Sequence, residues 1–219
     1  PAFVAANVPH IRRFAAVLRL GYSLFNQVVA VSQAQGTWLV QSGAVRASAL
    51  SVIPSCVDLT AFRSLDPVGS QLRVIGAIGR LDPQKGFDRL IAAFKRTTCA
   101  DLVLQIYGEG DESETLRDLA RPDPRIWFMG FSADPVAAMA AVDLVAMPSN
   151  WEAYGLVAIE ALAAGRGLLV SGIDGLADHI PHGAQGVADQ SGAAWHHALE
   201  RTVGEVPAIS QVPYMTGRS

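Results

Sequence analysis

Two carboxylates, Glu152 and Glu160, flank the start of an apolar helix that the sequence predicts for residues 154–164. A buried strand is expected at residues 143–147, and Pro148 begins the turn that ends it. The first amides of a helix have no carbonyl partners within that helix and carry partial positive charge, so they attract a phosphate. This segment therefore combines a phosphate-binding element with two acidic side chains that accept hydrogen bonds from hydroxyl groups.

The spacing of the two glutamates indicates the length of a suitable ligand. They are eight residues apart, which corresponds to at most about 12 Å along a helix axis. An extended ligand would place a diphosphate over the helix amides, a ribose diol at Glu160 and a sugar at Glu152. The helix is expected to begin near Tyr154 or Gly155, and Gly155 lets the ligand approach the backbone. The alternative is that Glu152 only caps the helix and that Glu160 is a partly solvated helix residue.

A second group of candidate residues follows the strand expected at residues 72–78. A glycine turn beginning at Gly79 carries Arg80 and Lys85, and a helix is expected from about Gly86. A strand, a glycine turn with cations and a helix start form a common anion-binding arrangement at the carboxyl edge of a parallel sheet. The two cations would neutralise a diphosphate leaving group. For either cation alone, an ordinary solvated loop side chain is the alternative.

Strands and helices alternate along the larger part of the chain, which predicts an α/β fold with a Rossmann-like parallel sheet and helices on both faces. The expected strands are residues 72–78, 102–107, 125–128, 143–147 and 167–171, with a further strand near 186–188. The expected helices are residues 86–97, 112–120, 134–141, 154–164 and 191–203.

Four sequence segments occur together in the order that characterises a known family: VVAVSQAQGTWLVQSGAVRASALSVIPSCVD, GRLDPQKG, YGEGDE and PSNWEAYGLVAIEALAAG. They resemble the retaining glycosyltransferases of family 4, which have the GT-B architecture of two facing Rossmann-like domains. The first segment is similar to the end of the acceptor domain and the second to the basic phosphate loop. The third is similar to the next glycine turn and the fourth to the carboxylate motif, so the resemblance covers most of the chain.

The resemblance implies roles for individual residues. Arg80 and Lys85 would bind the donor diphosphate and Glu152 would lie near the donor sugar, which makes these three the expected catalytic residues. Glu160 would bind the ribose. The other expected donor-binding residues are Gly79, Gly108, Phe131, Tyr154, Gly155 and Leu156. For Gly108, a plain turn is an equal alternative.

The activity implied by the resemblance is transfer of a sugar from a nucleotide diphosphate sugar to a hydroxyl acceptor, with retention of configuration. The leaving diphosphate would help to deprotonate the acceptor, while fixed cations and helix amides stabilise its charge. No cofactor and no metal ion are expected, and the sequence has no D-x-D triplet. A sugar-nucleotide-binding module or regulatory subunit without activity of its own is the alternative function. A GT-B phosphorylase or a sugar-nucleotide epimerase is a third.

The expected domain organisation follows from the same resemblance. Residues 1–58 would be the C-terminal remnant of the acceptor-side domain plus the start of a linker, 59–203 the Rossmann-like donor domain and 204–219 a tail. Turn formers in residues 54–70 indicate an interdomain linker. A complete enzyme of this kind is nearly twice as long, so the N-terminal domain is expected to be largely absent. The chain would then be a fragment, a proteolysed product or a short subunit whose acceptor domain comes from a partner.

Two acidic residues near the expected donor site depart from the pattern of the family. The segment DGLAD places Asp174 where a glycine is usual and Asp178 where a glutamate is usual. A side chain at position 174 is expected to narrow the sugar pocket or to change which sugar fits. His179 and the other histidines of this region are expected to have surface or capping roles, because they lack metal-ligand spacing.

The amino-acid composition limits which binding partners and which cellular location are expected for the protein. Half of the residues are hydrophobic and 17% are charged, as in a packed soluble domain. There is no secretory signal pattern and there are two cysteines, so a cytoplasmic location is expected. The acidic donor half argues against nucleic-acid binding. The segment HIRRFAAVLRLGYSLFNQ is either a core helix, the favoured interpretation, or an amphipathic helix at the inner face of a membrane, where a lipid-linked sugar acceptor would reside.

Overall fold

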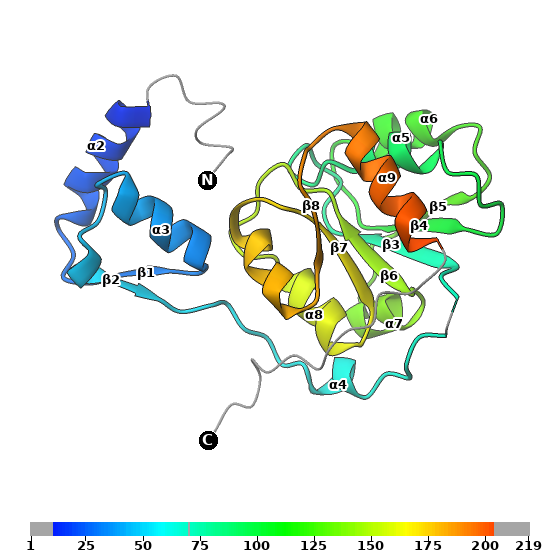
Figure 1. Ribbon diagram of the computed structural model, residues 1–219, viewed down its shortest axis with the longest axis horizontal. Coiled ribbons are helices and arrows are strands. Elements are labelled where there is room, and N and C mark those ends of the chain that lie inside the picture. The colour runs from blue at the N-terminus through cyan, green and yellow to red at the C-terminus, as the bar shows by residue number, and fades with distance from the viewer. Residues whose placement is uncertain (1–10, 70, 204–219) are drawn as a thin grey trace.

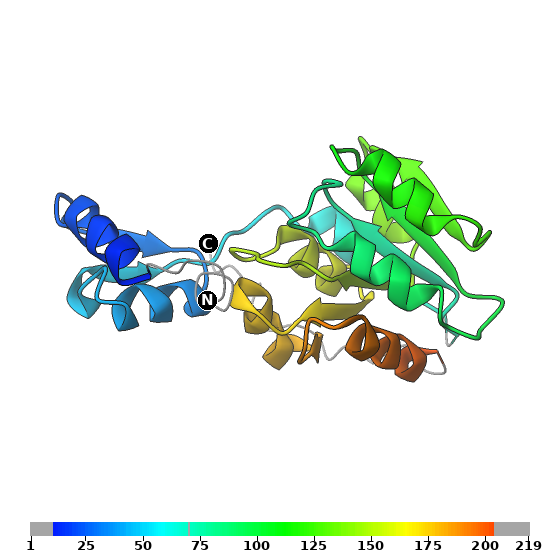
Figure 2. The ribbon, with the colours of Figure 1, turned by 90° about the horizontal axis from the view of Figure 1, so that it is seen from above.

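The computed structural model describes residues 11–69 and 71–203, with side chains described from residue 15 onward. These residues form two lobes that lie side by side and are joined by an extended connection (Figures 1 and 2). The predicted tail, residues 204–219, lies outside the described residues. Within the described part of the chain, no helix combines the length and the apolar composition needed to cross a bilayer.

The N-terminal lobe is built around a short parallel strand pair. β1 (Val28–Ala30) pairs with β2 (Leu50–Val52). Helix α2 (Ile11–Tyr22) precedes β1, and α3 (Gln33–Gln41) and the 3-10 helix η1 (Ala47–Ala49) connect the two strands. The small core of this lobe consists of Val28, Ala30, Leu39, Ala44 and Val45.

The larger lobe contains a six-stranded sheet in which every neighbouring pair of strands is parallel. The strands are β3 (Val74–Ile78), β4 (Val103–Tyr107), β5 (Ile126–Gly130), β6 (Leu144–Met147), β7 (Gly167–Ser171) and β8 (Gln185–Val187). Their order across the sheet is β5-β4-β3-β6-β7-β8. The predicted Rossmann-like parallel sheet is therefore confirmed, and each strand overlaps its expected range.

Helices cover both faces of this sheet, as predicted. The segments are α5 (Phe87–Phe94), α6 (Ser113–Ala120), α7 (Pro135–Ala140), α8 (Leu156–Ala163), the 3-10 helix η2 (Asp174–His182) and α9 (Gly192–Thr202). Helices α5, α6 and α9 cover one face, whereas α7, α8 and η2 cover the other (Figures 1 and 2). Because side chains alternate along each strand, the sheet separates two hydrophobic layers.

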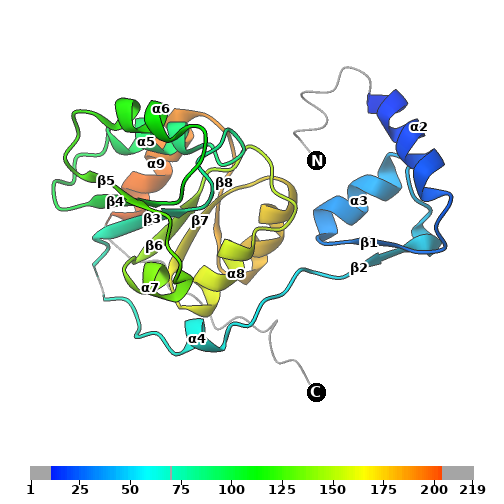
Figure 3. The same ribbon diagram turned by 180° about the vertical axis from the view of Figure 1, so that it is seen from behind.

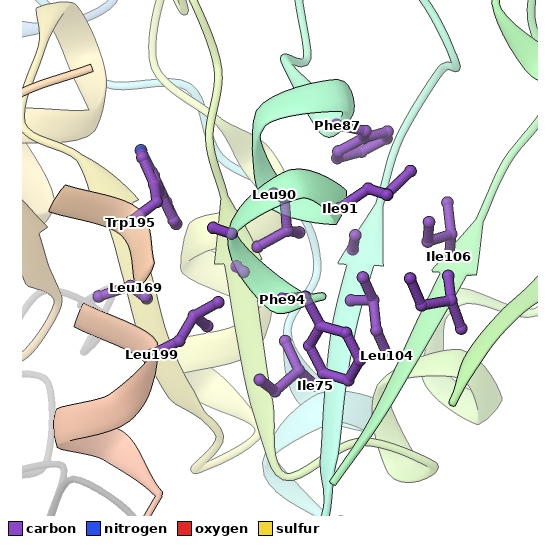
Figure 4. Packing of buried hydrophobic residues seen from close by; sticks show 14 of the residues in the cluster. Ile75, Phe87, Leu90, Ile91, Phe94, Leu104, Ile106, Leu169, Trp195 and Leu199 are labelled. Carbon is purple, nitrogen blue, oxygen red and sulfur yellow. The ribbon is translucent and has the colours of Figure 1, made fainter. Parts of the chain in front are cut away.

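The first hydrophobic layer is the larger one. Figure 4 shows Phe94 of α5 close to Ile75 and Leu104 of the central strands, with Trp195 and Leu199 of α9 packed beside them. All five side chains are fully buried. Burial of each apolar side chain of this size stabilises the fold by about 1.5–3 kcal/mol, so this layer holds the strands that carry the loops described below.

The connection between the lobes includes a helix that the sequence analysis did not predict. Residues 53–59 run without regular structure from β2 to α4 (Thr60–Arg63). Leu59 and Phe62 are buried in the second hydrophobic layer, which lies between the sheet and the helices α7, α8 and η2. Helix α4 contacts α7 and α8 (Figure 3). A helix of four residues is too short to show helical periodicity, so the turn formers of residues 54–70 dominated the prediction.

Candidate functional site

The strand order creates a switch point between β3 and β6. From β3 the chain continues to β4 on one side, and the strands on the other side begin with β6. The loops that leave the carboxyl ends of β3 and β6 therefore diverge toward opposite faces, and ligands of open α/β sheets bind in the crevice between such loops. Lys85 lies in the first of these loops and Glu152 in the second.

Lys85 and Glu152 meet directly at this point. The Nζ atom of Lys85 donates a hydrogen bond to Oε2 of Glu152 at 2.6 Å. The side chains are 15% and 13% exposed, respectively, so the ion pair is only slightly screened by water. The sequence predicts that these residues bind adjacent parts of one ligand, and the structure brings them into contact.

Hydrogen bonds join the two loops that carry this pair. The backbone N–H of Asn150 donates to the carbonyl of Gln84 at 2.8 Å, and its side-chain Nδ2 donates to the carbonyl of Pro83 at 2.6 Å. In return, Nε2 of Gln84 donates to the carbonyl of Trp151 at 3.1 Å. The two loops therefore form one connected unit, which fixes the relative position of the cation and the carboxylate.

Arg89, which the sequence analysis did not single out, supports the same unit from helix α5. Its guanidinium donates to the carbonyl of Pro148 at 3.1 Å, to Oδ1 of Asn150 at 2.5 Å and to Oε1 of Gln190. Burial lowers the pKa of Arg89 below its usual value, and the charges of Asp88 and Asp189 oppose this effect. Its partners lie 59 to 101 residues further along the chain, so no local sequence signal announces the contact.

Arg80 is placed at the rim of the site. Its side chain is 73% exposed, and its guanidinium contacts Oδ2 of Asp82 at 3.1 Å and Oε1 of Gln84 at 3.0 Å. It is therefore connected to the Glu152 loop through Gln84. An exposed guanidinium of this kind can turn toward a bound anion at small cost.

Two of the predicted glycines close the adjacent loops of β3 and β4. Gly79 has φ 156, and a Cβ atom there would lie 3.2 Å from Cε of Lys85. Gly108 has φ 138, and a Cβ atom there would lie 1.8 Å from the carbonyl oxygen of Gly79. Glycine is thus required at position 108 for close packing of the two loops. Phe131, directly after β5, is 71% exposed at the same edge of the sheet.

The amino end of α8 is free of a side-chain cap. Its N-cap residue is Gly155, with φ 88, and no side chain accepts a hydrogen bond from the first amides. Helices α7 and α9, in contrast, are capped by Asp134 and Ser191. A Cβ atom at Gly155 would lie 3.4 Å from Cγ of Glu152, so these amides begin beside the ion pair. Leu156 is 40% exposed, and Tyr154 is buried.

Glu160 lies on α8, one to two turns beyond the amides. It is half-buried, and burial raises the pKa of its carboxyl group above the usual 4.5. Within the described residues this carboxylate makes no hydrogen bond or ion pair. A half-buried carboxylate without a protein partner is costly, and hydroxyl groups of a ligand would supply the missing donors.

The 3-10 helix η2 packs against the Glu152 loop. The N–H of Gly175 donates to the carbonyl of Glu152 at 3.0 Å, and a Cβ atom at Gly175 would lie 2.1 Å from the carbonyl oxygen of Ala153. The preceding residue, Asp174, has φ 46 and is the single non-glycine residue with positive φ in the described chain. A strained conformation beside a candidate site is a frequent property of functional segments.

The sequence predicts a surface or capping role for His179. In the structure the side chain of His179 is fully buried. Its Nε2 lies 2.8 Å from the carbonyl of Tyr154, and the two rings lie 4.7 Å apart between centroids. Burial lowers the pKa of His179 from its usual 6.5, so the ring is neutral at neutral pH. It therefore supports the backbone that precedes α8 and is too deeply buried to reach a ligand.

A hollow elsewhere on the larger lobe lies away from the candidate residues. A shallow hollow of about 470 Å³ is lined by Arg117, Ala120, Arg121, Pro122, Asp123, Ile126 and Phe128. It lies at the amino edge of β5, opposite the edge that carries the candidate residues. No group of three or more histidine, cysteine or acidic side chains in the described part of the chain is arranged to hold a metal ion.

The fold defines an α/β domain of the Rossmann-like class, with the Lys85–Glu152 ion pair and the uncapped start of α8 at its switch point. The family model for Glycosyl transferases group 1 matches residues 72–204. The chain therefore belongs to this family.

Curated relatives are longer than this chain. It is 36% identical over 145 residues to the glycogen synthase of Mycobacterium tuberculosis (strain CDC 1551 / Oshkosh), which covers 61% of this chain and 34% of the relative. It is 30% identical over 211 residues to the D-inositol 3-phosphate glycosyltransferase of Segniliparus rotundus, which covers 86% of this chain and 45% of the relative. The chain thus spans less than half of the length of either protein.

Solved structures share the fold. Anabaena Alr3699/HepE in complex with UDP and glucose has a TM-score of 0.70 at 24% identity, covering 86% of this chain and 57% of HepE. Sucrose-phosphate synthase from Thermosynechococcus elongatus has a TM-score of 0.72 at 21% identity, covering 91% of this chain and 55% of that chain. The structural neighbours are GT-B glycosyltransferases, and the partial coverage fits the C-terminal half of that architecture.

Proposed function

We propose that this chain is the donor-binding part of a retaining glycosyltransferase of family 4, which transfers a sugar from a nucleotide diphosphate sugar to a hydroxyl acceptor. One observation carries the proposal: the ion pair of Lys85 and Glu152 lies at the switch point of the sheet, beside the uncapped amino end of α8. Cation, carboxylate and helix amides are the groups that a sugar diphosphate needs within a short span.

The donor would lie along the start of α8. Its diphosphate would bind the first amides of α8 together with Lys85, and Arg80 would approach from the rim. The ribose diol would donate hydrogen bonds to Glu160, whose carboxylate is half-buried and has no hydrogen-bond partner among the described residues. Glu152 would accept hydrogen bonds from hydroxyl groups of the sugar when the diphosphate takes over Lys85. The nucleobase would lie near Phe131, an exposed aromatic residue suited to stacking.

The reaction would exchange one C1–O bond for another. The bond from C1 of the sugar to the diphosphate oxygen breaks, and a bond from C1 to the acceptor oxygen forms on the same face of the sugar. The acceptor proton passes to the leaving diphosphate. The residues Lys85 and Arg80 and the amides of α8 stabilise the negative charge on that group without reorganising, which favours the transition state.

The ligands of known relatives support this proposal and indicate which nucleotides to test first. HepE has been crystallised with UDP and with UDP-glucose. The named relatives act on different substrates, so the acceptor, a sugar or a lipid-linked sugar, is proposed as a class only. No metal ion is included in the proposal, because Lys85 and Arg80 supply the positive charge.

A sugar-nucleotide-binding module without activity of its own is the second candidate. It is favoured by the observation that the ion pair and the uncapped start of α8 suffice to hold a sugar diphosphate, because binding alone needs no acceptor residues. In this case the acceptor-binding residues would come from another polypeptide or from a further part of the same protein.

Calorimetric titration with UDP, GDP and ADP, followed by assays of nucleotide release from the corresponding sugar nucleotides, would test both candidates. Binding together with acceptor-dependent release of nucleotide supports the transferase, and nuclear magnetic resonance of the product would report the anomeric configuration. Binding without release, with all acceptors tried, supports the binding module. If none of the three nucleotides binds, the proposed donor site is wrong.

A further inference from the structure

We propose that Asp178 is a positioning residue that fixes the N-terminal lobe in one orientation relative to the larger lobe. Its two carboxylate oxygens accept hydrogen bonds from the backbone of the other lobe. The N–H of Gln33 donates to Oδ2 at 2.6 Å, and the N–H of Ala34 donates to Oδ1 at 3.3 Å. These donors precede Asp178 by 145 and 144 residues, so the contact is purely tertiary.

The contact completes the cap of helix α3. Within that helix, Oγ of Ser32 accepts from the N–H of Gln35 at 3.1 Å, and the Ser32 carbonyl accepts from the N–H of Gly36 at 3.0 Å. The first four amides of a helix have no partners of their own. The Gly36 bond is the first hydrogen bond of the helix itself. Of the amides that precede it, Ser32 satisfies that of Gln35, and Asp178 from the other lobe satisfies those of Gln33 and Ala34. The cap is therefore shared between two distant parts of the chain.

This geometry determines an orientation as well as a contact. A carboxylate that accepts two neighbouring N–H groups, one on each oxygen, restrains both position and rotation. Its negative charge also interacts favourably with the positive end of the helix dipole. Asp178 therefore restrains α3 more firmly than a single neutral hydrogen bond would.

Few other features of the described residues restrain the N-terminal lobe. Contact between α3 and η2 is the most extensive contact between elements of the two lobes. The covalent connection, residues 53–59, has no regular structure. Loss of the Asp178 contact would therefore allow the lobes to rotate about this connection.

Asp178 is itself fixed to the candidate site. It lies on η2, where Gly175 donates to the carbonyl of Glu152 at 3.0 Å and His179 contacts the carbonyl of Tyr154 at 2.8 Å. The segment thus contacts the site loops on one side and α3 on the other. The inference does not depend on the proposed function, because it concerns the arrangement of the free protein.

Amide hydrogen exchange measured by nuclear magnetic resonance on the whole chain would test the contact. In Asp178→Ala, the amides of Gln33 and Ala34 are expected to exchange about fivefold faster, the usual consequence of losing a helix cap. The amide of Gln35 should change less, because its partner is Ser32. Asp178→Asn keeps an acceptor oxygen without the charge and should be intermediate. Asp111→Ala, at an exposed acidic residue, is the matched control.

A distance measurement would test the orientation. Spin labels would be attached at Gln41→Cys and Thr115→Cys, one exposed position in each lobe, in a background with Cys56→Ser and Cys99→Ala. A narrow distance distribution is expected with Asp178, and a broad or shifted one with Asp178→Ala or Asp178→Asn. Circular dichroism would confirm that each variant is folded. Unchanged distributions and unchanged exchange in folded Asp178→Asn would overturn the proposal.

Discussion

The Nζ atom of Lys85 and Oε2 of Glu152 are 2.6 Å apart, although their loops leave two different strands, β3 and β6. In this arrangement the cation and the carboxylate neutralise each other. An anion that recruits Lys85 must compete with Glu152 and in doing so releases this carboxylate for hydroxyl groups. Binding of the diphosphate and recognition of the sugar would thereby be coupled.

Loss of the two cations should weaken nucleotide binding. Lys85→Met is expected to lower the affinity for a nucleoside diphosphate about 10–100-fold, the range for a hydrogen bond to a charged group. Adding Arg80→Met should lower it further, because a second diphosphate contact is lost. Titration calorimetry would measure both effects. As a control, Arg96→Met removes an exposed cation at the opposite end of α5 and should leave the affinity unchanged. Equal nucleotide affinity in all of these variants would refute the site.

Glu160→Gln should separate stability from binding. The pKa of Glu160 in the folded protein is raised by burial, so the ionised carboxylate destabilises the fold at pH 7, and this penalty fades as the pH falls through that pKa. The variant is therefore expected to have a higher free energy of unfolding at pH 7, with a smaller difference near pH 4.5, and about tenfold weaker nucleotide binding. Urea unfolding and calorimetry would test this, with exposed Glu114→Gln as control. A less stable variant at pH 7 would contradict the expected sign.

The buried imidazole of His179 should contribute a dependence of stability on pH. Burial lowers its pKa in the folded protein below 6.5, so the unfolded chain binds more protons under acidic conditions. The contribution of His179 is fully present above about pH 6.5 and is lost as the pH falls toward the lowered pKa. His179→Asn should lack this loss, so its free energy of unfolding should decline less than that of the parent between pH 7 and pH 5. Exposed His197→Asn should decline like the parent, and identical profiles for all three proteins would be evidence against the assignment.

Glycine at position 108 should be far less replaceable than glycine at position 130. Both have positive φ, but an added Cβ would meet the carbonyl of Gly79 at position 108 and nothing within 4 Å at position 130. Gly130→Ala is expected to cost about 1–2 kcal/mol from backbone strain alone. Gly108→Ala should cost about 3 kcal/mol or more, because a clash is added. Chemical denaturation of both variants would measure the difference, and similar costs would contradict the close approach of the two loops.

Strain at Asp174 can be isolated by comparing two substitutions that remove the same carboxylate. Asp174 has φ 46, where glycine is unstrained and alanine is not. Asp174→Gly is expected to be more stable than Asp174→Ala by about 1 kcal/mol, or about 2–4 °C in Tm. Thermal unfolding would measure this, and equal Tm values would show that the backbone at this position relaxes. Comparison of donor sugars in the two variants would also test the expectation that residue 174 affects sugar choice.

Local sequence patterns were sufficient to predict the elements around the site. The apolar strand ending at Met147, the turn after it and the helical spacing from Leu156 predicted the β6-turn-α8 unit, and the observed helix is Leu156–Ala163. Glycines at positions 86 and 155 marked the starts of α5 and α8, where both are N-cap residues. Such signals are local because they depend on residue type and on helical or strand periodicity.

The supporting contacts could not be predicted in the same way. Arg89 reads as an ordinary helix residue, since its partners Pro148 and Asn150 are about 60 residues away in sequence. Burial of His179 also depends on long-range packing, because η2 is a 3-10 segment interrupted by Pro181 and its buried face is set by contact with the Glu152 loop. Tertiary contacts of this kind are absent from single-sequence patterns, which is why the site loops were predicted and their supports were not.

The strand pair of the N-terminal lobe has a consequence for handling the protein in solution. In the described chain, β1 and β2 pair only with each other. Val29 in β1 is 51% exposed, and Ile53, directly after β2, is 58% exposed. Parallel strands normally occur in larger sheets covered on both sides, and open strand edges with apolar side chains are templates for joining further chains. Concentrated preparations of the chain should accordingly be prone to self-association through this lobe, whereas the central strands of the larger lobe are enclosed between neighbouring strands.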